Sequence, residues 1–332
     1  MKVLVTGGLG FIGSHTTVSL IEQGYEVVII DNLSNSHLGV LDVLNKITQK
    51  KIPFYKIDAT DEKKLKQVFE IESFDAVIHF AGFKAVGESV QIPLKYYFNN
   101  LMSTISVANL CKQYGVQKFV FSSSSTVYGE NNTSVYETMS LFPTTNPYGE
   151  TKAMCERILR DLCKSDDTFE IAILRYFNPI GAHSTGLIGE LPNGIPNNLM
   201  PYITQVAKGK RPYLEVFGND YPTIDGTGVR DYIHVMDLAE GHVAALKKLN
   251  RGAHVYNLGT GSGTSVLQLI TAFEKVNDIR VPYKIVGRRL GDIAYSVANV
   301  DKAKNELGWS AKRTIEVMCE DSWRFERMLK IK

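Results

Sequence analysis

The sequence predicts an α/β protein built on a doubly wound parallel sheet, and three observations point to that class. Short apolar segments alternate with segments of helical length through the first half of the chain. The apolar segments are continuous, which is typical of strands that are buried on both faces. A glycine-rich stretch joins the first of these strands to the first helix. Helices on both faces of a parallel sheet account for all three observations.

Each element is predicted from its own residues. The strand segments KVLVT, EVVII, IPFYKI, DAVIHF, KFVFSS and EIAILRY are apolar and rich in β-branched and aromatic residues. The first helix ends at Gly24 and a long helix begins just after Pro93, because glycine is enriched where helices end and proline where they begin. We expect strands at 2–6, 26–30, 52–57, 75–80, 118–123 and 170–176, and helices at 11–23, 38–50, 61–71, within 94–114 and at 147–164.

The texture of the sequence changes after about residue 178. Pro, Gly and Asn become frequent through NPIGAHSTGLIGELPNGIPNN, and the regular alternation is lost. We therefore place a domain boundary near residue 180, which divides the chain into 1–180 and 181–332. VYNLG at 255–259 reads as another buried strand, followed by a helix from about 264 to 276. Parts near 234–276 can therefore return to the first sheet.

Composition argues against several classes of protein. A net charge of +2 gives no electrostatic case for binding nucleic acid or an anionic membrane. No apolar run reaches the roughly 18–20 residues that span a bilayer, and MKVLVTGG does not read as a signal peptide. The cysteines form no CxxC motif, and no His cluster has metal spacing. We expect a cytoplasmic protein with reduced thiols and no metal site. The four cysteines are Cys111, Cys155, Cys163 and Cys319.

The loop after the first strand predicts a dinucleotide site. In TGGLGFIGS, Gly7, Gly10 and Gly13 are spaced as G-x-x-G-x-x-G. Glycine permits a tight turn, close backbone approach to a pyrophosphate and close helix packing, and the helix N-terminus offers free N–H groups to the phosphates. The alternative is a plain glycine-rich turn, but Asp31 at the end of the second strand supplies the context that the motif requires.

Two carboxylates indicate how the nucleotide is held. Asp31 can accept hydrogen bonds from ribose hydroxyls and would repel a 2′-phosphate, and the nearby loop NLSNSH contains no arginine, so NAD is favoured over NADP. Asp58, at the end of the third strand, can bond an adenine amino group. Its alternative role is the N-cap of the following helix, DEKKLKQVF.

Tyr148 and Lys152 are four residues apart in a predicted helix and share one of its faces. Tyr114 and Lys118 have the same spacing, but Gly115 ends the helix between them and their side chains should diverge. Free tyrosine has a pKa near 10, and lowering it by about three units requires about 4 kcal/mol of preference for the phenolate. A nearby ammonium and an oxidised nicotinamide would supply it.

A serine run lies at the end of the strand KFVF, at the carboxyl edge of the sheet where α/β proteins bind ligands. One of these hydroxyls can bond a reacting hydroxyl group and guide its proton to the phenolate of Tyr148. The alternative for the run is a polar turn. The serines are Ser122, Ser123, Ser124 and Ser125.

These motifs together resemble the extended short-chain dehydrogenase/reductase family. TGGLGFIGS, the serine run with TVYGE, YGETK and RYFNPIGAH carry the resemblance. HFAGFKAVGES, FGNDYP, DGTGVRDYIHV and RRLGD are similar to the members that epimerise UDP-hexoses at C4, over nearly the whole chain. The resemblance implies a Rossmann domain, a smaller C-terminal α/β domain for the nucleotide sugar, an active site in the cleft between them, bound NAD and a homodimer.

The resemblance also implies roles for individual residues. Ser124 and Tyr148 would bracket the hexose C4 hydroxyl, and Lys152 would bond the nicotinamide ribose. The residues expected to hold NAD are Gly7, Gly10, Phe11, Ile12, Gly13, Asp31, Asn32, Asn35, Asp58, Ala59, Phe80, Ala81, Lys84, Asn99, Ser122, Tyr148, Lys152 and Tyr176. Those expected to hold the UDP-hexose are Lys84, Ser124, Tyr148, Phe177, Asn178, Asn198, Leu199, Phe217, Arg230, Tyr232, Arg289, Asp292 and Ser296.

Alternatives remain open for some of these roles. Tyr176 and Phe177 can be core residues at a strand end and still flank the nicotinamide. Arg288 competes with Arg289 for the phosphate. Ser296 would flank the 2-substituent of the sugar, where serine leaves room for an N-acetyl group; Tyr295 beside it makes that assignment sensitive to a shift of one residue.

The implied reaction is reversible C4 epimerisation of UDP-galactose and UDP-glucose, and possible action on UDP-GalNAc and UDP-GlcNAc follows from Ser296. Tyr148 would take the C4 hydroxyl proton while hydride moves to NAD, the 4-keto sugar would turn, and hydride would return to its other face. A 4,6-dehydratase is the nearest alternative, but SSSSTVYG has no carboxylate before Glu130. A uronic-acid epimerase, a decarboxylase and a regulator that binds NAD without turnover are the others.

Overall fold

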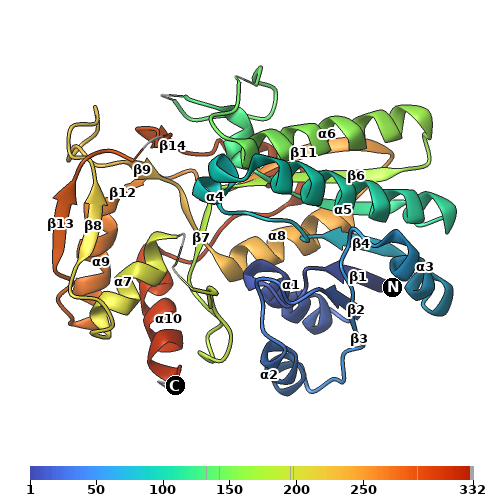
Figure 1. The fold of residues 1–332 in the computed structure, drawn as a ribbon, viewed down its shortest axis with the longest axis horizontal. Coiled ribbons are helices and arrows are strands. Elements are labelled where there is room, and N and C mark those ends of the chain that lie inside the picture. The colour runs from blue at the N-terminus through green and yellow to red at the C-terminus, as the bar shows by residue number, and fades with distance from the viewer. Residues whose placement is uncertain (132, 142, 195, 197, 290, 330–332) are drawn as a thin grey trace.

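The central sheet of the computed structural model is parallel throughout, with strand order β11-β6-β5-β4-β1-β2-β3 (Figure 1). The structure describes residues 1–131, 133–141, 143–194, 196, 198–289 and 291–329. The predicted α/β class with a doubly wound parallel sheet is confirmed. The sheet strands are β1 (Lys2–Thr6), β2 (Glu26–Asp31), β3 (Phe54–Lys56), β4 (Ala76–His79), β5 (Lys118–Ser124), β6 (Glu170–Tyr176) and β11 (Gly252–Leu258).

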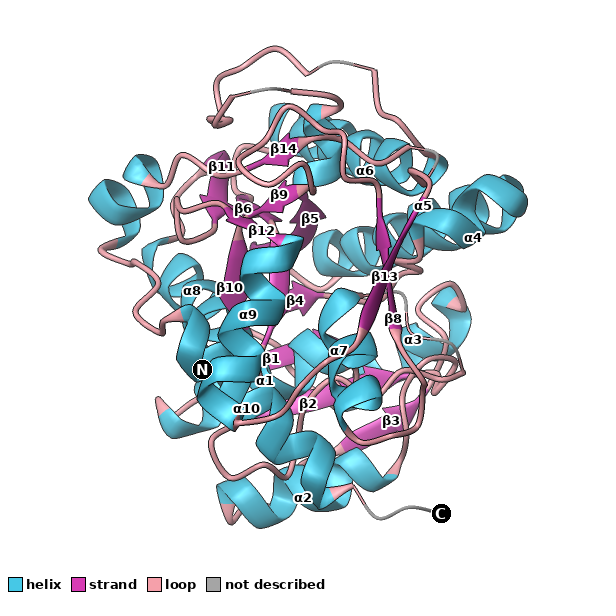
Figure 2. Cartoon of the chain, turned by 90° about the vertical axis from the view of Figure 1, so that its left-hand side faces the viewer, coloured by secondary structure: helices cyan, strands magenta, loops and turns pink. Residues whose placement is uncertain are grey.

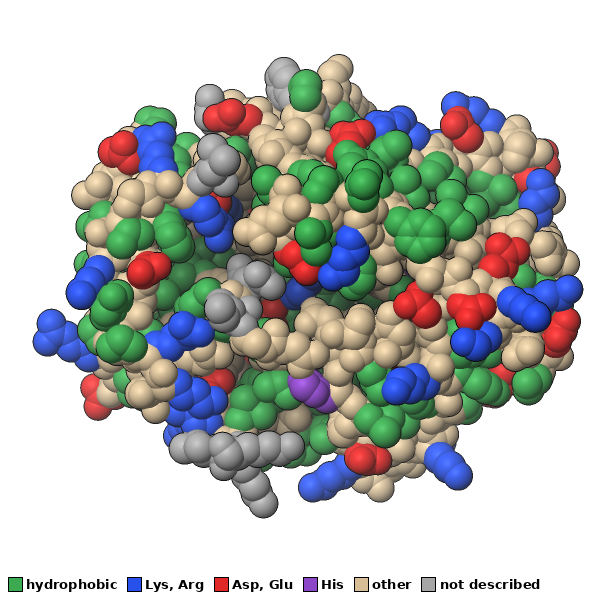
Figure 3. Space-filling view, viewed as in Figure 1, with side chains coloured by type: hydrophobic (Ala, Val, Ile, Leu, Met, Phe, Trp, Pro, Cys, Tyr) green, Lys and Arg blue, Asp and Glu red, His purple; other side chains and the backbone are tan. Residues whose placement is uncertain are grey.

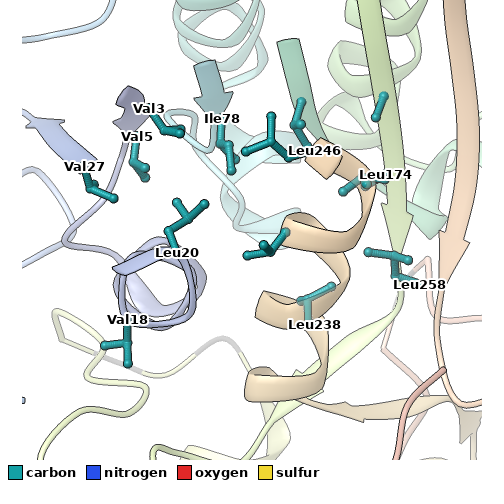
Figure 4. Close-up of a cluster of buried hydrophobic side chains, with 14 of the residues drawn as sticks. Val3, Val5, Val18, Leu20, Val27, Ile78, Leu174, Leu238, Leu246 and Leu258 are labelled. Atoms are coloured by element: carbon teal, nitrogen blue, oxygen red, sulfur yellow. The ribbon is translucent and has the colours of Figure 1, made fainter. Parts of the chain in front are cut away.

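Helices cover both faces of this sheet because successive strand side chains point to opposite faces. Val3 and Val5 pack with Leu20 and Leu246 on one face, as Figure 4 shows. Leu4 packs on the other face. The first face carries α1 (Phe11–Glu22), α2 (Gly39–Thr48) and α8 (Val235–Lys248), and the second carries α3 (Glu62–Ile71), α5 (Pro93–Gln113) and α6 (Pro147–Ser165).

The predicted elements of the first half are all present, with ends that differ by up to two residues. One short helix, α4 (Val86–Gln91), was not predicted. Its six residues end just before Pro93, and so short a segment carries no helical period that a sequence pattern can reveal. It packs against α5 and α6.

The described residues of the second part of the chain form three small sheets and a separate apolar core. Figure 2 views the molecule from the side of this part, with β8 and β13 paired toward the viewer. Ile203, Phe273 and Trp323 meet in its core. Its elements are β7 (Asn178–Ile180), α7 (Leu199–Ala207), β8 (Leu214–Phe217), β9 (Val229–Arg230), β10 (Tyr232–His234), β12 (Thr264–Ser265), α9 (Val266–Asn277), β13 (Tyr283–Val286), β14 (Tyr295–Ser296) and α10 (Ile315–Met328). A short 3₁₀ helix, η1 (Ser125–Tyr128), follows β5, and a short π-helix, η2 (Ala303–Leu307), precedes α10.

The chain crosses between the two parts more than once. β11 pairs with β6 at the edge of the central sheet, and α8 packs against α1. α9, by contrast, packs against α10 in the second core. The domain boundary near residue 180 therefore stays a prediction, because β11 and α8 follow it in the chain but pack with the first part.

Every helix among the described residues is too short or too polar to span a bilayer.

Candidate functional site

The turn between β1 and α1 has glycine where a side chain would collide with backbone. Gly7 has φ +68°, and a Cβ there would lie 2.9 Å from the nitrogen of Ala81. A Cβ at Gly13 would lie 2.3 Å from the carbonyl oxygen of Gly7. Gly10 is the N-cap of α1, whose first N–H groups have no partner within the helix. The turn therefore presents free N–H groups that a phosphate can approach closely.

Asp31 stands at the end of β2 with its carboxylate fixed beside this turn. It accepts hydrogen bonds from Leu9 N at 3.1 Å, Leu33 N at 2.9 Å and Ser36 Oγ at 2.7 Å. A carboxylate has about four acceptor positions, so one remains for a ligand hydroxyl.

Asp58 does not cap α3, so that alternative is wrong. Asp61 is the N-cap and accepts from Lys64 N. Asp58 instead accepts from Thr60 N at 2.9 Å, Thr60 Oγ1 at 2.7 Å and Asn32 Nδ2 at 2.8 Å. Burial raises the pKa of Asp58, but these hydrogen bonds outweigh it and leave the pKa below its ordinary value. The ionised carboxylate lines the cavity beside Asp31.

Two adjoining cavities, of about 530 and 400 Å³, run along the carboxyl edge of the sheet. Both are lined by Gly7, Asp31 and Lys84, so they form one continuous groove. All the residues that the sequence predicted to hold a dinucleotide lie along one or both of them. Figure 3 shows this side of the molecule hollowed near its centre.

The groove changes character along its length. Asp31, Asn32 and Asp58 make one end polar. Phe80, Tyr148 and Tyr176 make the other end aromatic. A cleft of this size with a few placed polar groups suits an elongated ligand that has a sugar–base end and a flat ring end.

Tyr148 and Lys152 lie in the first two turns of α6 and line the aromatic end of the groove. Asn146 caps the helix by accepting from Gly149 N at 2.9 Å, and Pro147 occupies the first turn. Lys152 Nζ donates to the carbonyl oxygen of Ser122 at 2.7 Å. Its charge also lies 4.9 Å from the ring centroid of Phe121. Lys152 is therefore held by the end of β5, and Tyr148 lies one turn earlier on the same helix.

The protonation of this pair is set by burial. Burial lowers the pKa of Lys152 to about 8, and Cys155 and Glu156 oppose that change. Burial raises the pKa of Tyr148, and a hydrogen bond with Ser124 opposes that change. At neutral pH the lysine is charged and the tyrosine is neutral. A phenolate in this place needs further positive charge from a bound group.

Ser124 has its hydroxyl proton free to donate. Its Oγ accepts from Thr126 N at 3.3 Å and Thr126 Oγ1 at 3.0 Å. Ser122 Oγ bonds the hydroxyl of Tyr176. Ser122 and Ser124 therefore both contact residues of the site, and the interpretation of the run as a simple polar turn does not account for these contacts.

The second tyrosine–lysine pair has no such arrangement. Tyr114 caps the end of α5 and its hydroxyl bonds Glu70, whereas Lys118 begins β5 and faces Glu170 at 4.0 Å. As expected, the two side chains point to different partners.

Apart from Lys84, Ser124 and Tyr148, the residues predicted to hold a nucleotide sugar lie from Phe177 onward in the chain, outside the two cavities. Phe177 is buried among apolar side chains, so its core alternative holds. Asn178 N donates to Asp231 O at 3.0 Å as β7 runs beside β10. Leu199 is the first residue of α7, and Tyr232 is buried in the second core.

Arg289, not Arg288, lies with the other predicted residues. Arg289 Nη2 donates to Asp292 at 2.8 Å, and its guanidinium lies 5.4 Å from the ring centroid of Phe217. Arg288 turns away to Asp220, which accepts at 2.7 Å. The sequence could not separate two adjacent arginines, but the structure does.

Ser296 of β14 is paired in register with Arg230 of β9. Paired residues of neighbouring strands share a face, so Ser296 lies beside the predicted phosphate ligand. The ring of Tyr295 lies against Gly263 instead, 3.6 Å from where a Cβ would stand there. The register thus favours Ser296 over Tyr295 for a role next to the substrate.

Two residues that the sequence analysis missed join separate segments around the site. Glu190 Oε1 accepts from Lys84 Nζ at 3.0 Å and from Asn198 Nδ2 at 2.6 Å, so it joins a cofactor candidate to a substrate candidate. Asn100 bonds the backbone of Phe83 through both N–H and C=O and also reaches Thr151 on α6. No motif marks either residue, because both depend on contacts between distant segments.

Comparison with known proteins agrees with this geometry. The model of the NAD dependent epimerase/dehydratase family matches residues 3–259. The chain belongs to that family. A curated UDP-glucose 4-epimerase from Bacillus subtilis is 58% identical over 328 residues, covering 98% of this chain and 97% of the relative.

Solved structures of the family agree over the full length. UDP-glucose 4-epimerase from Bifidobacterium longum in complex with NAD+ and UDP superposes with a TM-score of 0.96 at 49% identity, covering 98% of both chains. The enzyme from Stenotrophomonas maltophila with bound NAD and formylated UDP-arabinopyranose gives 0.96 at 50% identity, again covering 98% of both chains.

NAD fits the residues present in this member of the family. The turn is too tight for a Cβ at Gly7 or Gly13, as a close backbone approach to a pyrophosphate requires, and Asp31 keeps one acceptor position beside it. The aromatic end of the groove, with Tyr176 and Phe80, suits a flat ring.

Gly13→Ala should lower the amount of NAD that the protein retains. The new methyl group would lie 2.3 Å from backbone, so the turn must shift. Overpacking of this kind costs about 1–3 kcal/mol, which lowers affinity about tenfold or more. NAD released from the denatured, purified protein measures the effect. Gly87→Ala is the control, since nothing lies within 4 Å of a Cβ there. Equal NAD content in both variants would contradict the assignment of the turn.

Proposed function

We infer that this protein catalyses the reversible C4 epimerisation of UDP-galactose and UDP-glucose with bound NAD. The observation that carries the proposal is the position of Tyr148 and Lys152, which line the same groove as the glycine turn and Asp31. A tyrosine–lysine pair beside a dinucleotide site is suited to moving the proton of a sugar hydroxyl. The full-length similarity to UDP-glucose 4-epimerases supports the choice of sugar.

In the proposed reaction, Ser124 donates a hydrogen bond to the C4 oxygen and Tyr148 removes the hydroxyl proton. Bound NAD supplies a hydride acceptor at C4 and returns the hydride to the opposite face. Lys152, held by Ser122 O, keeps positive charge beside the tyrosine and lowers the energy of its phenolate. Tyr148 then returns the proton to the inverted C4 oxygen.

The second part of the molecule would anchor UDP while the hexose turns. Arg230 and Arg289 are suited to the diphosphate, because guanidinium groups bond phosphate oxygens in pairs. Phe217 is partly exposed and can pack on the uracil, and Asp292 can accept from the ribose hydroxyls. Arg289 and Asp292 are already paired, which prearranges both for the nucleotide.

The structure does not favour the dehydratase alternative. That reaction needs an acid–base pair close to the active-site serine to remove water from C5 and C6. The turn η1 that follows Ser124 consists of Ser125, Thr126, Val127 and Tyr128 and carries no carboxylate. A regulator without turnover is also disfavoured, because both Tyr148 and Lys152 are present and placed.

Tyr148→Phe should abolish epimerisation and leave NAD bound. Removal of a general acid–base lowers kcat by about 10²–10⁴-fold. Conversion of UDP-galactose followed by NMR measures the rate, and released NAD measures the cofactor. Tyr114→Phe is the matched control, because that hydroxyl lies outside the groove and bonds Glu70. A Tyr148→Phe protein with near-normal kcat would contradict the proposed role.

We propose that the enzyme also accepts the N-acetylated sugars UDP-GlcNAc and UDP-GalNAc. Ser296 lies in register with Arg230, so it would stand near the point where the sugar is attached to the diphosphate. Serine is small there, and its neighbour Tyr295 points to Gly263.

Ser296→Tyr should therefore lower kcat/KM for UDP-GalNAc by about tenfold to a hundredfold, which corresponds to a clash of about 1–3 kcal/mol. The same variant should keep activity on UDP-galactose. Tyr295→Phe is the control, since its ring faces away. Unchanged activity of Ser296→Tyr on the acetylated sugar would refute the proposal.

We also propose a homodimer in the cytoplasm. α4 and α5 expose an apolar stripe: the side chains of Val90, Leu94, Phe98 and Ile105 are 54%, 81%, 66% and 39% exposed. Leu94 and Phe98 are one turn apart and share a helix face. Figure 3 shows hydrophobic side chains gathered over α4 and α5. An exposed apolar stripe of this kind commonly packs against the same stripe of a second copy in a symmetric dimer.

A Leu94→Glu/Phe98→Glu variant should halve the mass measured by light scattering, because buried charges disfavour the interface. Ile71→Glu, on α3 and outside the stripe, should leave the mass unchanged; its side chain is 70% exposed. If the unaltered protein is already a monomer, the dimer proposal is wrong.

A further inference from the structure

Three buried polar side chains lie behind the catalytic residues, and the proposed reaction does not use them. Ser123 of β5, Glu156 of α6 and Arg175 of β6 are 0%, 2% and 2% exposed. Ser123 and Arg175 lie on neighbouring strands of the sheet, Glu156 lies on the helix that covers the second face, and the three side chains meet at one point. Burying two charges and a hydroxyl is costly unless they satisfy each other.

The three groups hydrogen-bond each other, and only Arg175 Nη1 among their described polar atoms is buried without a partner. Glu156 Oε1 accepts from Ser123 Oγ at 2.6 Å and from Arg175 Nε at 2.9 Å. Glu156 Oε2 accepts from Arg175 Nη2 at 2.6 Å. The guanidinium fork matches the carboxylate with two parallel bonds, which fixes orientation as well as distance. It also lies 4.7 Å from the ring centroid of Tyr128 in η1.

Each group is either next in the chain to a residue of the proposed site or one helical turn from it. A strand or helix carries its neighbours with it, so fixing these three side chains fixes the backbone beside the site. The neighbouring pairs are Ser123 with Ser122 and Ser124, Arg175 with Tyr176, and Glu156 with Lys152 one helical turn earlier.

Glu156 is also the carboxylate that acts on Lys152. It shares a helix face with Lys152 and opposes the effect of burial on the ammonium, as does Cys155. The groups that face Lys152 are Tyr148, Cys155 and Glu156 on its own helix, His79 on β4, and Ser122 and Phe121 on β5, with Tyr176 of β6 beside Ser122.

We propose that the Glu156–Arg175 pair is a positioning unit of the active site, which locks α6 against the carboxyl ends of β5 and β6 and faces the ammonium of Lys152 with a negative charge. Stability alone is a weak reason for such a pair, since apolar residues of similar volume often replace a buried ion pair without loss. The inference rests on the proposed function, because it concerns the reactivity of Lys152 in that reaction.

A charge-neutral double variant, Glu156→Gln/Arg175→Met, tests the proposal in the NAD-loaded protein. The protonation of Lys152 is followed by NMR in protein labelled with [6-13C]lysine, with the signal assigned by its loss in Lys152→Met. The midpoint should fall relative to the unaltered protein, because Glu156 raises the pKa of Lys152 whereas Arg175 is not among the groups that act on it. The alkaline fall in kcat should move to lower pH by the same amount, since the charged lysine is lost as pH rises through its pKa.

Glu72→Gln is the matched control. Glu72 also forms a partly buried ion pair, with Lys2 at 2.8 Å, but at the amino end of β1, the end of the sheet opposite the site. In the Glu72→Gln variant, the titration midpoint of Lys152 and the pH profile of kcat should equal those of the unaltered protein. If the double variant melts at a lower temperature yet keeps the Lys152 midpoint and the pH profile, the pair is structural only and the proposal is wrong.

Arg175→Lys keeps the test decisive if the double variant does not fold. Lysine retains the charge but cannot form the two-bond fork. Loss of register should lower kcat several-fold with KM for UDP-galactose unchanged, and Arg175→Lys with normal kcat would overturn the positioning role. Failure of the proposed function is separate: the unaltered protein would then show no epimerisation, while the NMR midpoints would still report on Glu156.

Discussion

The buried ammonium of Lys152, bonded to the carbonyl oxygen of Ser122 at 2.7 Å, is the contact on which the rest of the site depends. A cation in so buried a place is costly unless groups around it compensate. The ring of Phe121 and the carboxylate of Glu156 supply this compensation. This one bond joins the first turns of α6 to the end of β5, and it thereby places Tyr148 at the edge where a parallel sheet receives its ligands.

The rest of the architecture brings a cofactor to that edge and a nucleotide sugar opposite it. The tight turn at Gly7 and Gly13 is suited to close approach of a pyrophosphate, and the acceptor position left on Asp31 is suited to a ribose hydroxyl. Glu190 joins the loop that carries Lys84 to the segment that carries Asn198. The two halves of the site are thus connected by hydrogen bonds as well as by the chain.

The sequence predicted the features that depend on neighbouring residues and missed those that depend on contacts between distant segments. Strand and helix periods, the glycine turn and the Tyr148–Lys152 spacing each depend on a few neighbouring residues, so they could be read directly. The role of Asp58 was left open because a cap and a ligand look alike in sequence, and only the bond from Lys64 N to Asp61 decides it. Glu190 and the Glu156–Arg175 pair carried no signal, because their partners lie far away in the chain.

The most direct test of the account uses UDP-galactose labelled with deuterium at C4, incubated with the purified protein and no added cofactor. The account predicts UDP-glucose that retains deuterium at C4, because the hydride leaves and returns within the closed site while only the hydroxyl proton passes through Tyr148. Replacement of the label by solvent hydrogen would contradict it, since that outcome requires C4 to lose a proton to water. Absence of UDP-glucose, even after NAD is added, would contradict the proposed activity itself.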